Sequence, residues 1–312
     1  MGKKHISVAN FNVVFYQGEN EKALLDYFDE IVMPVFTSGI IRSSGDATYR
    51  LMDVEVRQEN SDFVLTGLIV KKTMLEVKSD LTSDGVLIEK DEKYPTAPFS
   101  TFIIYLKNHR MLYAENQKGS PNLKSFRSTV QYMFSQYAKG MMKTADDGVE
   151  VPIPIVNVVG IPTRDTLKDT LKNVEKIEKL TLRFYPLNGD LDITGMLQGF
   201  SSDLRKLVGS KNGEIVFKSP ENVNGVLEVI EQSEGTVEPI FRVRYPGKRK
   251  GTINNDMISE RMEVEVAGEN VSQEMEALIG KGKEIKSLSY VSEGNRQIYE
   301  SNKSKIIPFC KK

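Results

Sequence analysis

The sequence has no tryptophan, one cysteine and two histidines, and each scarcity excludes a class of protein. Cys310 has no second cysteine to pair with, which rules out an internal disulfide and a cysteine-rich zinc site and indicates a reducing compartment. His5 and His109 lie far apart in the chain, and they leave almost no material for a histidine metal site or a Ser/His or Cys/His hydrolase. We therefore expect neither a metal nor another cofactor.

Long apolar runs are absent as well. No window approaches the roughly 18 consecutive apolar residues of a membrane-spanning helix, and the N-terminal segment lacks the apolar stretch of a signal peptide. The phosphate-binding patterns GxxxxGK[ST] and GxGxxG do not occur either. These absences predict a cytoplasmic protein that does not span the membrane, and they remove the clearest signatures of nucleotide hydrolysis and dinucleotide binding.

The remaining composition is that of an ordinary globular protein. Charged residues make up 27% of the 312 residues and hydrophobic residues 39%. A chain of this length buries roughly 75% of its unfolded surface and commonly forms about two domains.

Hydrophobic periodicity in the first half predicts one α+β unit. Residues 5–16 alternate apolar and polar side chains, as in a strand, and an amphipathic helix follows until Pro34 interrupts it. Short β-rich runs separated by turn residues fill 40–113 and predict an antiparallel meander, and a helix that opens at Ser120-Pro121 closes the unit. We expect the first domain to span residues 1–148.

Strands and helices alternate again in the second half, which we expect to form a domain over residues 149–312. The expected strands lie at 151–160, 213–218, 240–245 and 261–267, a further strand runs into a turn over 179–190, and the expected helices lie at 164–176, 196–208 and 223–232. The fold class predicted for the whole chain is α+β, with two domains that each contain a mainly antiparallel sheet and packed helices.

The net charge of −1 hides a strong local asymmetry. Residues 1–92 carry 10 basic against 16 acidic residues, a net charge of −6, whereas residues 93–143 carry eight basic residues against the single acid Glu115, a net charge of +7. Phosphate neutralisation by lysine and arginine is the sequence-independent part of nucleic-acid affinity. The middle segment is therefore the first candidate for a nucleic-acid interface.

Two clusters of basic residues form the predicted interface. The first cluster surrounds one hairpin and the start of the following helix, whose N-terminal amides also favour an anion; it consists of Lys107, Arg110, Lys118, Lys124 and Arg127. The second lies on a strand and its turn and consists of Arg242, Arg244, Lys248, Arg249 and Lys250. The alternative for each cluster is a solvated basic surface that serves solubility or partner docking, with the neighbouring aromatic side chains in the core.

One local pattern is compatible with metal-dependent catalysis. Asp62 precedes a strand with Glu76 and Lys78 on one face, and nucleases use such carboxylates to hold Mg²⁺ and such a lysine to stabilise developing charge. The same alternation is typical of the solvent face of any antiparallel strand. A second acidic pair, Asp190 and Asp192, follows a tight turn in which Asp is expected, and it lacks the other ligands of a calcium loop.

The order of several segments resembles a known family. The segments are PTAPFSTFIIYLKNHRMLYAEN, the helix that begins SPNLKSFRSTVQYMF, the strand IPIVNVVG and the strand and turn KLTLRFYPLNGD. In this order the chain resembles the two-domain phage-exclusion proteins of the RexA type and related bacterial phage-defence proteins such as KwaB. The resemblance spans residues 1–270 and includes no catalytic signature. It implies a cytoplasmic, dimeric protein that binds double-stranded DNA without sequence specificity and acts with a membrane partner.

These observations predict a bacterial or phage-encoded anti-phage protein of the abortive-infection type that binds nucleic acid, and double-stranded DNA in particular. Two alternatives stay open, namely a metal-dependent nuclease effector and a protein-interaction module that senses a phage component. A homodimer is expected because two-fold pairing doubles a shallow basic surface.

Overall fold

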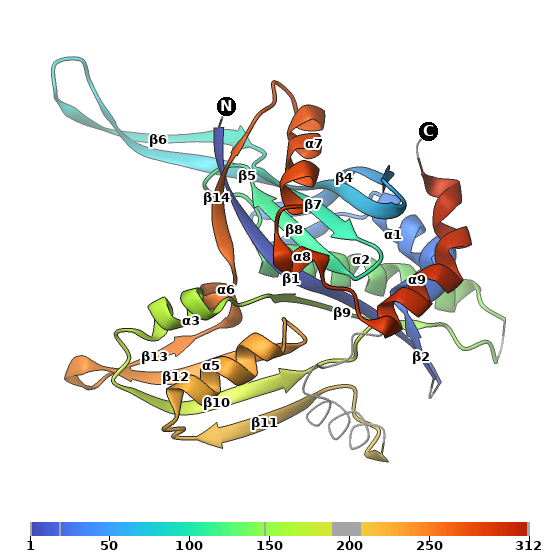
Figure 1. The fold of residues 1–312 in the computed structure, drawn as a ribbon. Helices are drawn as coiled ribbons and strands as arrows, with labels where there is room; N and C mark the ends of the chain where they lie inside the picture. The colour runs from blue at the N-terminus through green and yellow to red at the C-terminus, as the bar shows by residue number, and fades with distance from the viewer. Residues whose placement is uncertain (1, 19, 147, 189–206, 311–312) are drawn as a thin grey trace.

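The computed structural model describes residues 2–18, 20–146, 148–188 and 207–310, in which two antiparallel sheets are packed with helices (Figure 1). The predicted α+β fold class is confirmed. The helix expected at 196–208 lies outside the described residues except for its last two positions, and Asp190 and Asp192 also lie outside them.

Ten strands form the larger sheet, in the order β14-β1-β8-β7-β5-β4-β3, with β2 and β9 also paired to β1 and β6 paired to β5. Their bounds are β1 (Gly2–Gln17), β2 (Asn20–Ala23), β3 (Arg42–Ser44), β4 (Ala47–Glu59), β5 (Asp62–Leu81), β6 (Leu87–Thr96), β7 (Phe99–Tyr105), β8 (Arg110–Glu115), β9 (Ile153–Gly160) and β14 (Arg261–Val266). Strands β3 to β8 follow one another along the chain and pair antiparallel, which confirms the predicted meander.

Strand β1 is the centre of this sheet because it is long enough to pair with different strands along its length. Its first half lies between β14 and β8, and its second half pairs with β9 and β2. The alternation that predicts the strand also sorts its side chains: Phe11, Val13 and Phe15 point into one core and Ile6 and Val8 into another.

The amphipathic segment after β1 is helical but not a single α-helix. It consists of a 3₁₀ turn, η1 (Leu24–Tyr27), a π turn, η2 (Phe28–Val32), and the short helix α1 (Met33–Thr37). Pro34 therefore lies in the first turn of α1 instead of ending the helical segment. A proline fits the first turn of a helix because the missing N–H has no intrahelical acceptor there.

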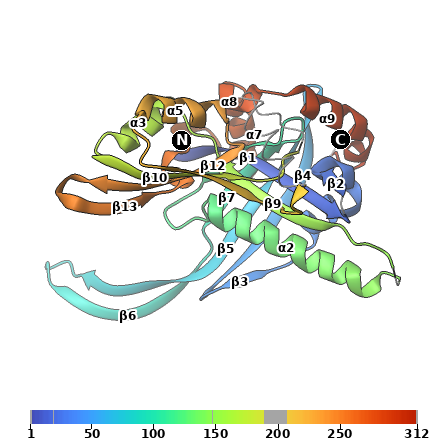
Figure 2. The same ribbon diagram turned by 90° about the horizontal axis from the view of Figure 1, so that it is seen from below.

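Helix α2 (Leu123–Thr144) covers one face of the larger sheet, as Figure 2 shows from below. Asn122 caps it by accepting a hydrogen bond from the Ser125 backbone N–H at 2.9 Å. Its buried stripe, which includes Phe126, Val130 and Phe134, packs into the core that Phe11 and Phe15 enter from β1. The expected closing helix is thus confirmed.

The C-terminal segment returns to the larger sheet. Helices α7 (Val271–Gly282) and α8 (Lys286–Ser289) lie over the second core of that sheet, and α9 (Glu293–Ile306), which leads into η4 (Ile307–Phe309), packs beside η1 and η2. Together with β9 and β14, these elements come from beyond residue 148. The larger sheet and its helices therefore cross the expected boundary at 148/149.

Tyr299 of α9 forms a buried hydrogen bond with the larger sheet, and its replacement is expected to lower stability. Its buried hydroxyl accepts a hydrogen bond from the Phe63 backbone N–H on β5 at 3.0 Å, and burial raises the pKa of Tyr299 to about 12. Replacing Tyr299 with phenylalanine leaves that N–H unsatisfied, so we expect the free energy of unfolding to fall by about 1–3 kcal/mol.

The same substitution is expected to change the pH dependence of stability. The pKa of Tyr299 is higher in the folded protein than the value near 10 of an unfolded chain, so its contribution is complete below that value and is lost as the pH rises from about 10 to 12. Urea unfolding across this range should show a smaller decline for Tyr299→Phe than for the natural protein. Tyr132→Phe, on the partly exposed side of α2, is the control, and equal stability of both variants at neutral pH would contradict the prediction.

The smaller sheet has four strands in the order β11-β10-β12-β13. They are β10 (Lys176–Phe184), β11 (Gly213–Lys218), β12 (Val237–Tyr245) and β13 (Arg249–Ile253), and the turn η3 (Pro246–Lys248) joins the last two. One face of the sheet packs against α3 (Arg164–Leu171), α5 (Val223–Gln232) and α6 (Asn255–Ile258) through a core of its own, which includes Leu167, Leu180, Leu227, Phe241 and Ile258. Figure 1 shows α3 and α5 on the same side of these strands.

The outer halves of β5 and β6 leave the body of the protein as a two-stranded ribbon (Figures 1 and 2). One face of the ribbon carries a series of ion pairs, among them Glu76 with Lys93 at 2.8 Å and Asp80 with Lys90 at 3.0 Å. The other face carries apolar side chains in register, Leu75 opposite Tyr94 and Leu81 opposite Leu87, and all four are more than half exposed. Glu92 opposite Val77 and Glu89 opposite Ser79 lie between these two apolar pairs on the same face, so that face is mixed in character.

Candidate nucleic-acid interface

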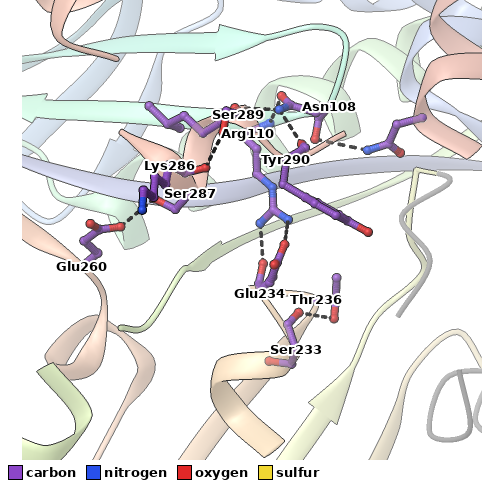
Figure 3. Close-up of polar contacts among 12 residues, drawn as sticks. Asn108, Arg110, Ser233, Glu234, Thr236, Glu260, Lys286, Ser287, Ser289 and Tyr290 are labelled. Carbon is purple, nitrogen blue, oxygen red and sulfur yellow. Dashed lines mark hydrogen bonds and ion pairs between the residues drawn. The ribbon is translucent and has the colours of Figure 1, made fainter. Parts of the chain in front are cut away.

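Arg110, the central residue of the first predicted cluster, is not on the surface. It begins β8 and is 1% exposed, and its guanidinium donates hydrogen bonds to the backbone carbonyl of Glu234 and, at 3.1 Å, to the Glu234 carboxylate (Figure 3). The ring of Tyr290 lies 5.9 Å from the guanidinium. Because a buried charge needs a partner, Arg110 joins the larger sheet to the turn after α5. The prediction that it binds phosphate is wrong.

The other members of the first cluster are dispersed. Lys107 pairs with Asp62 at 3.0 Å, and Arg127 donates a hydrogen bond to the Asn157 side chain at 3.0 Å while lying 5.3 Å from the centre of the Tyr185 ring. Lys118 and Lys124 are exposed. The cluster is therefore not one phosphate track, because sequence proximity does not determine which side chains the hairpin and the helix turn toward solvent.

The three residues of the nuclease alternative do not meet. Asp62 and Glu76 belong to the same extended strand, and fourteen residues of strand separate them by about 46 Å. Asp62 is held by Lys107, whereas hydrogen bonds from Lys93 and Lys78 on the ribbon lower the pKa of the Glu76 carboxyl. In the described ranges, no group of three or more His, Cys, Asp or Glu side chains is placed to hold a metal ion.

The second predicted cluster is brought together only in part. Alternation along β12 and β13 places Arg242, Arg244 and Lys250 on the face of the smaller sheet opposite α3 and α5, which we call the open face. Arg249 alternates to the other face, where its guanidinium lies 5.3 Å from the centre of the Tyr245 ring. Lys248 is exposed in the turn between the strands.

Strand pairing adds three lysines to the open face. None of the three belongs to the cluster predicted from the sequence. Lys179 of β10 lies directly between Lys218 of β11 and Arg242 of β12, so that these three cations form one row across the sheet. The adjacent row contains Lys176, Arg244 and Lys250. A signal was present in the alternation of KLTLRF and GEIVFK, but only the register between strands shows that the basic positions coincide.

The open face is only partly neutralised. A bulge between Ile177 and Lys179 admits Glu178, which lies 3.6 Å from Lys250, and Glu175 lies 3.6 Å from Arg244. The other four cations, Lys176, Lys179, Lys218 and Arg242, have no ion-pair partner among the residues that the structure describes. The open face therefore carries an excess of positive charge that neighbouring carboxylates do not neutralise.

One member of the first cluster does reach the smaller sheet. Arg127, in the first turns of α2, lies 3.8 Å from the Glu238 carboxylate at the start of β12. Arg242 is four residues further along that strand, which is about 13 Å. Lys124 lies one helical turn before Arg127, so the N-terminal part of α2, with its favourable dipole, borders the open face.

Comparisons with known proteins add no assignment. No family model matches the sequence, and no curated protein matches it. Within the described ranges, no helix is both long and apolar enough to cross a membrane.

Proposed function

We propose that this protein binds double-stranded DNA without sequence specificity through the open face of the smaller sheet. The observation that carries the proposal is the pair of adjacent basic rows, which together contain Lys176, Lys179, Lys218, Arg242, Arg244 and Lys250. Four strands span about 14 Å, a length over which a duplex presents about eight phosphate charges. Four of the six cations on this area have no acidic partner among the described residues, so they are available to phosphates of the bound duplex.

The side chains between the cations favour backbone contacts over base recognition. Thr181, Val216, Ile240 and Thr252 occupy the other positions in the middle of the open face, and none of them is aromatic. Single-stranded nucleic acid is commonly held by bases stacked on aromatic rings, which this part of the face does not offer. Contacts to phosphate position a duplex but do not read its sequence.

The biological setting follows from the family resemblance. In the proposed role the protein is a cytoplasmic homodimer in an anti-phage system of the abortive-infection type, which engages phage DNA and acts with a membrane or phage protein partner. Two-fold pairing would double the number of phosphate contacts, because each protomer contributes one open face.

A salt titration with unrelated DNA duplexes tests the proposal. We expect the logarithm of the binding constant to fall linearly with the logarithm of the salt concentration, with a slope of about −3.6 per protomer if the four cations without an acidic partner each contact a phosphate. A parallel incubation with Mg²⁺ is expected to leave the DNA intact. Absence of binding at about 50 mM salt would overturn DNA binding, and metal-dependent cleavage would instead support the nuclease.

A further inference from the structure

A groove runs along the outer edge of β14, beside the ion pair of Arg110 and Glu234 that joins the two sheets. Its volume is about 1010 Å³, and its walls are β14 itself, the loop from Ile161 to Arg164, the end of α5 and the segment that links α7 to α8. Buried Arg110 and its partner Glu234 form part of the wall (Figure 3). The groove therefore lies where the two sheets meet.

The edge of β14 that faces away from β1 has no paired strand in the described part of the chain, as Figure 1 also shows. The Val8 backbone N–H donates to the Glu260 carbonyl at 3.3 Å and its carbonyl accepts from the Ile161 N–H at 2.9 Å, so the backbone groups of Val8, and by alternation those of Ile6 and Lys4, are directed toward the side of β1 on which β14 lies. Hydrogen-bonded and non-hydrogen-bonded pairs alternate, so the backbone N–H and C=O groups of Glu263 and Glu265 are directed away from β1. An edge of this kind is a template for another strand.

The groove is acidic. Six glutamates line it against four cations, and three of those cations are neutralised in place: Arg110 by Glu234, Arg164 by Glu231 and Lys281 by Glu284, each at 3.1 Å. Lys286 is the fourth cation. Of the three remaining glutamates, Glu260 accepts a hydrogen bond from Ser287 at 2.7 Å and Glu263 lies 3.2 Å from the exposed Lys3. Glu265, one of the two residues whose main chain is directed at the groove, has no ion-pair partner among the described residues, and Glu263 beside it is held by Lys3.

We propose that the groove binds an extended segment of a partner protein, which adds a strand to β14 and carries lysine or arginine at every second position. Main-chain hydrogen bonds to an exposed edge provide affinity in such complexes, and alternate side chains provide selectivity. Alternate basic side chains of the added strand share one face with Glu263 and Glu265. The excess of glutamate disfavours nucleic acid here, so this surface is separate from the DNA-binding open face and does not depend on it.

The test uses the full-length protein and a fluorescently labelled heptapeptide of alternating valine and lysine. We expect saturable binding, at least 10-fold weaker binding of the same peptide with glutamate in place of lysine, and slower hydrogen exchange of the Glu263 and Glu265 amides in the complex. The variant Glu263→Lys/Glu265→Lys should also bind at least 10-fold more weakly. Glu228→Lys/Glu300→Lys, which makes the same change of charge at exposed positions outside the groove, should bind normally.

A second probe separates strand addition from simple charge attraction and requires no variant to fold. In a depsipeptide analogue, esters replace the backbone amides and remove the N–H donors while the lysines stay. Strand addition predicts at least 10-fold weaker binding of this analogue. Equal binding of peptide and analogue, unchanged exchange at Glu263 and Glu265, or no binding of the lysine peptide would each overturn the proposal.

Discussion

Replacing Arg110 with methionine is expected to lower the free energy of unfolding by about 1.5–3 kcal/mol, the usual cost of losing hydrogen bonds to a charged group. The guanidinium is 1% exposed and donates hydrogen bonds to both the backbone carbonyl and the carboxylate of Glu234, so its removal takes both of these bonds away from the junction. Urea or thermal unfolding at neutral pH measures the loss.

Two comparisons make this result specific to the pair. Lys124→Met, which removes an exposed cation of the same predicted cluster, should change stability by less than about 0.5 kcal/mol. The double variant Arg110→Met/Glu234→Met should recover part of the loss, because an apolar pair carries no uncompensated charge. A loss below about 1 kcal/mol for Arg110→Met would mean that the pair does not join the sheets.

Neutralising the open face is the second large effect that we expect. The variant Lys179→Gln/Arg242→Gln removes two adjacent cations of the central row, and each lost phosphate contact should reduce the steepness of the salt dependence by about 0.9. Together the two substitutions should make the slope less negative by about 1.8. They should also lower the affinity by about the same factor for every duplex, whatever its sequence. Both side chains lie on the solvent side of the sheet, so stability should be preserved.

The matched control is Lys168→Gln/Lys172→Gln. These exposed lysines lie in and directly after α3, on the covered side of the same sheet, and their replacement makes the same change in net charge. We expect the control to bind DNA with the slope of the natural protein. If both variants weaken binding equally, the affinity follows total charge and not the open face. Arg110→Met should also bind DNA with the affinity of the natural protein, provided that binding is measured under conditions in which the variant is folded.

Several elements were predictable because their signals are local. The alternation of residues 5–16 predicts β1, the turn signals between residues 40 and 113 predict the meander, and the apolar stripe after Pro121 predicts α2. The amphipathic period after residue 20 predicts one helix that Pro34 interrupts, whereas the segment contains a 3₁₀ turn, a π turn and a short helix with Pro34 in its first turn.

The site depended on contacts that are distant in sequence. Arg110 and Lys179 are both basic residues at strand positions, but Arg110 meets Glu234 in the junction, whereas Lys179 aligns with Lys218 and Arg242 at the surface. Composition predicts that such charges exist, and periodicity predicts which strand they occupy. Neither specifies the partner of a buried charge or the register between strands.

The sequence by itself therefore determined the fold class, the absence of a disulfide and the presence of basic clusters, since these depend on composition and on periods of two and 3.6 residues. Only the tertiary structure decided that one cluster is divided between a buried ion pair and scattered surface sites, and that the other extends over four strands. The physical reason is that burial and strand register arise from packing between segments that are distant in the sequence, as for Lys179 and Arg242 in the sheet and for Arg110 and Glu234 in the junction.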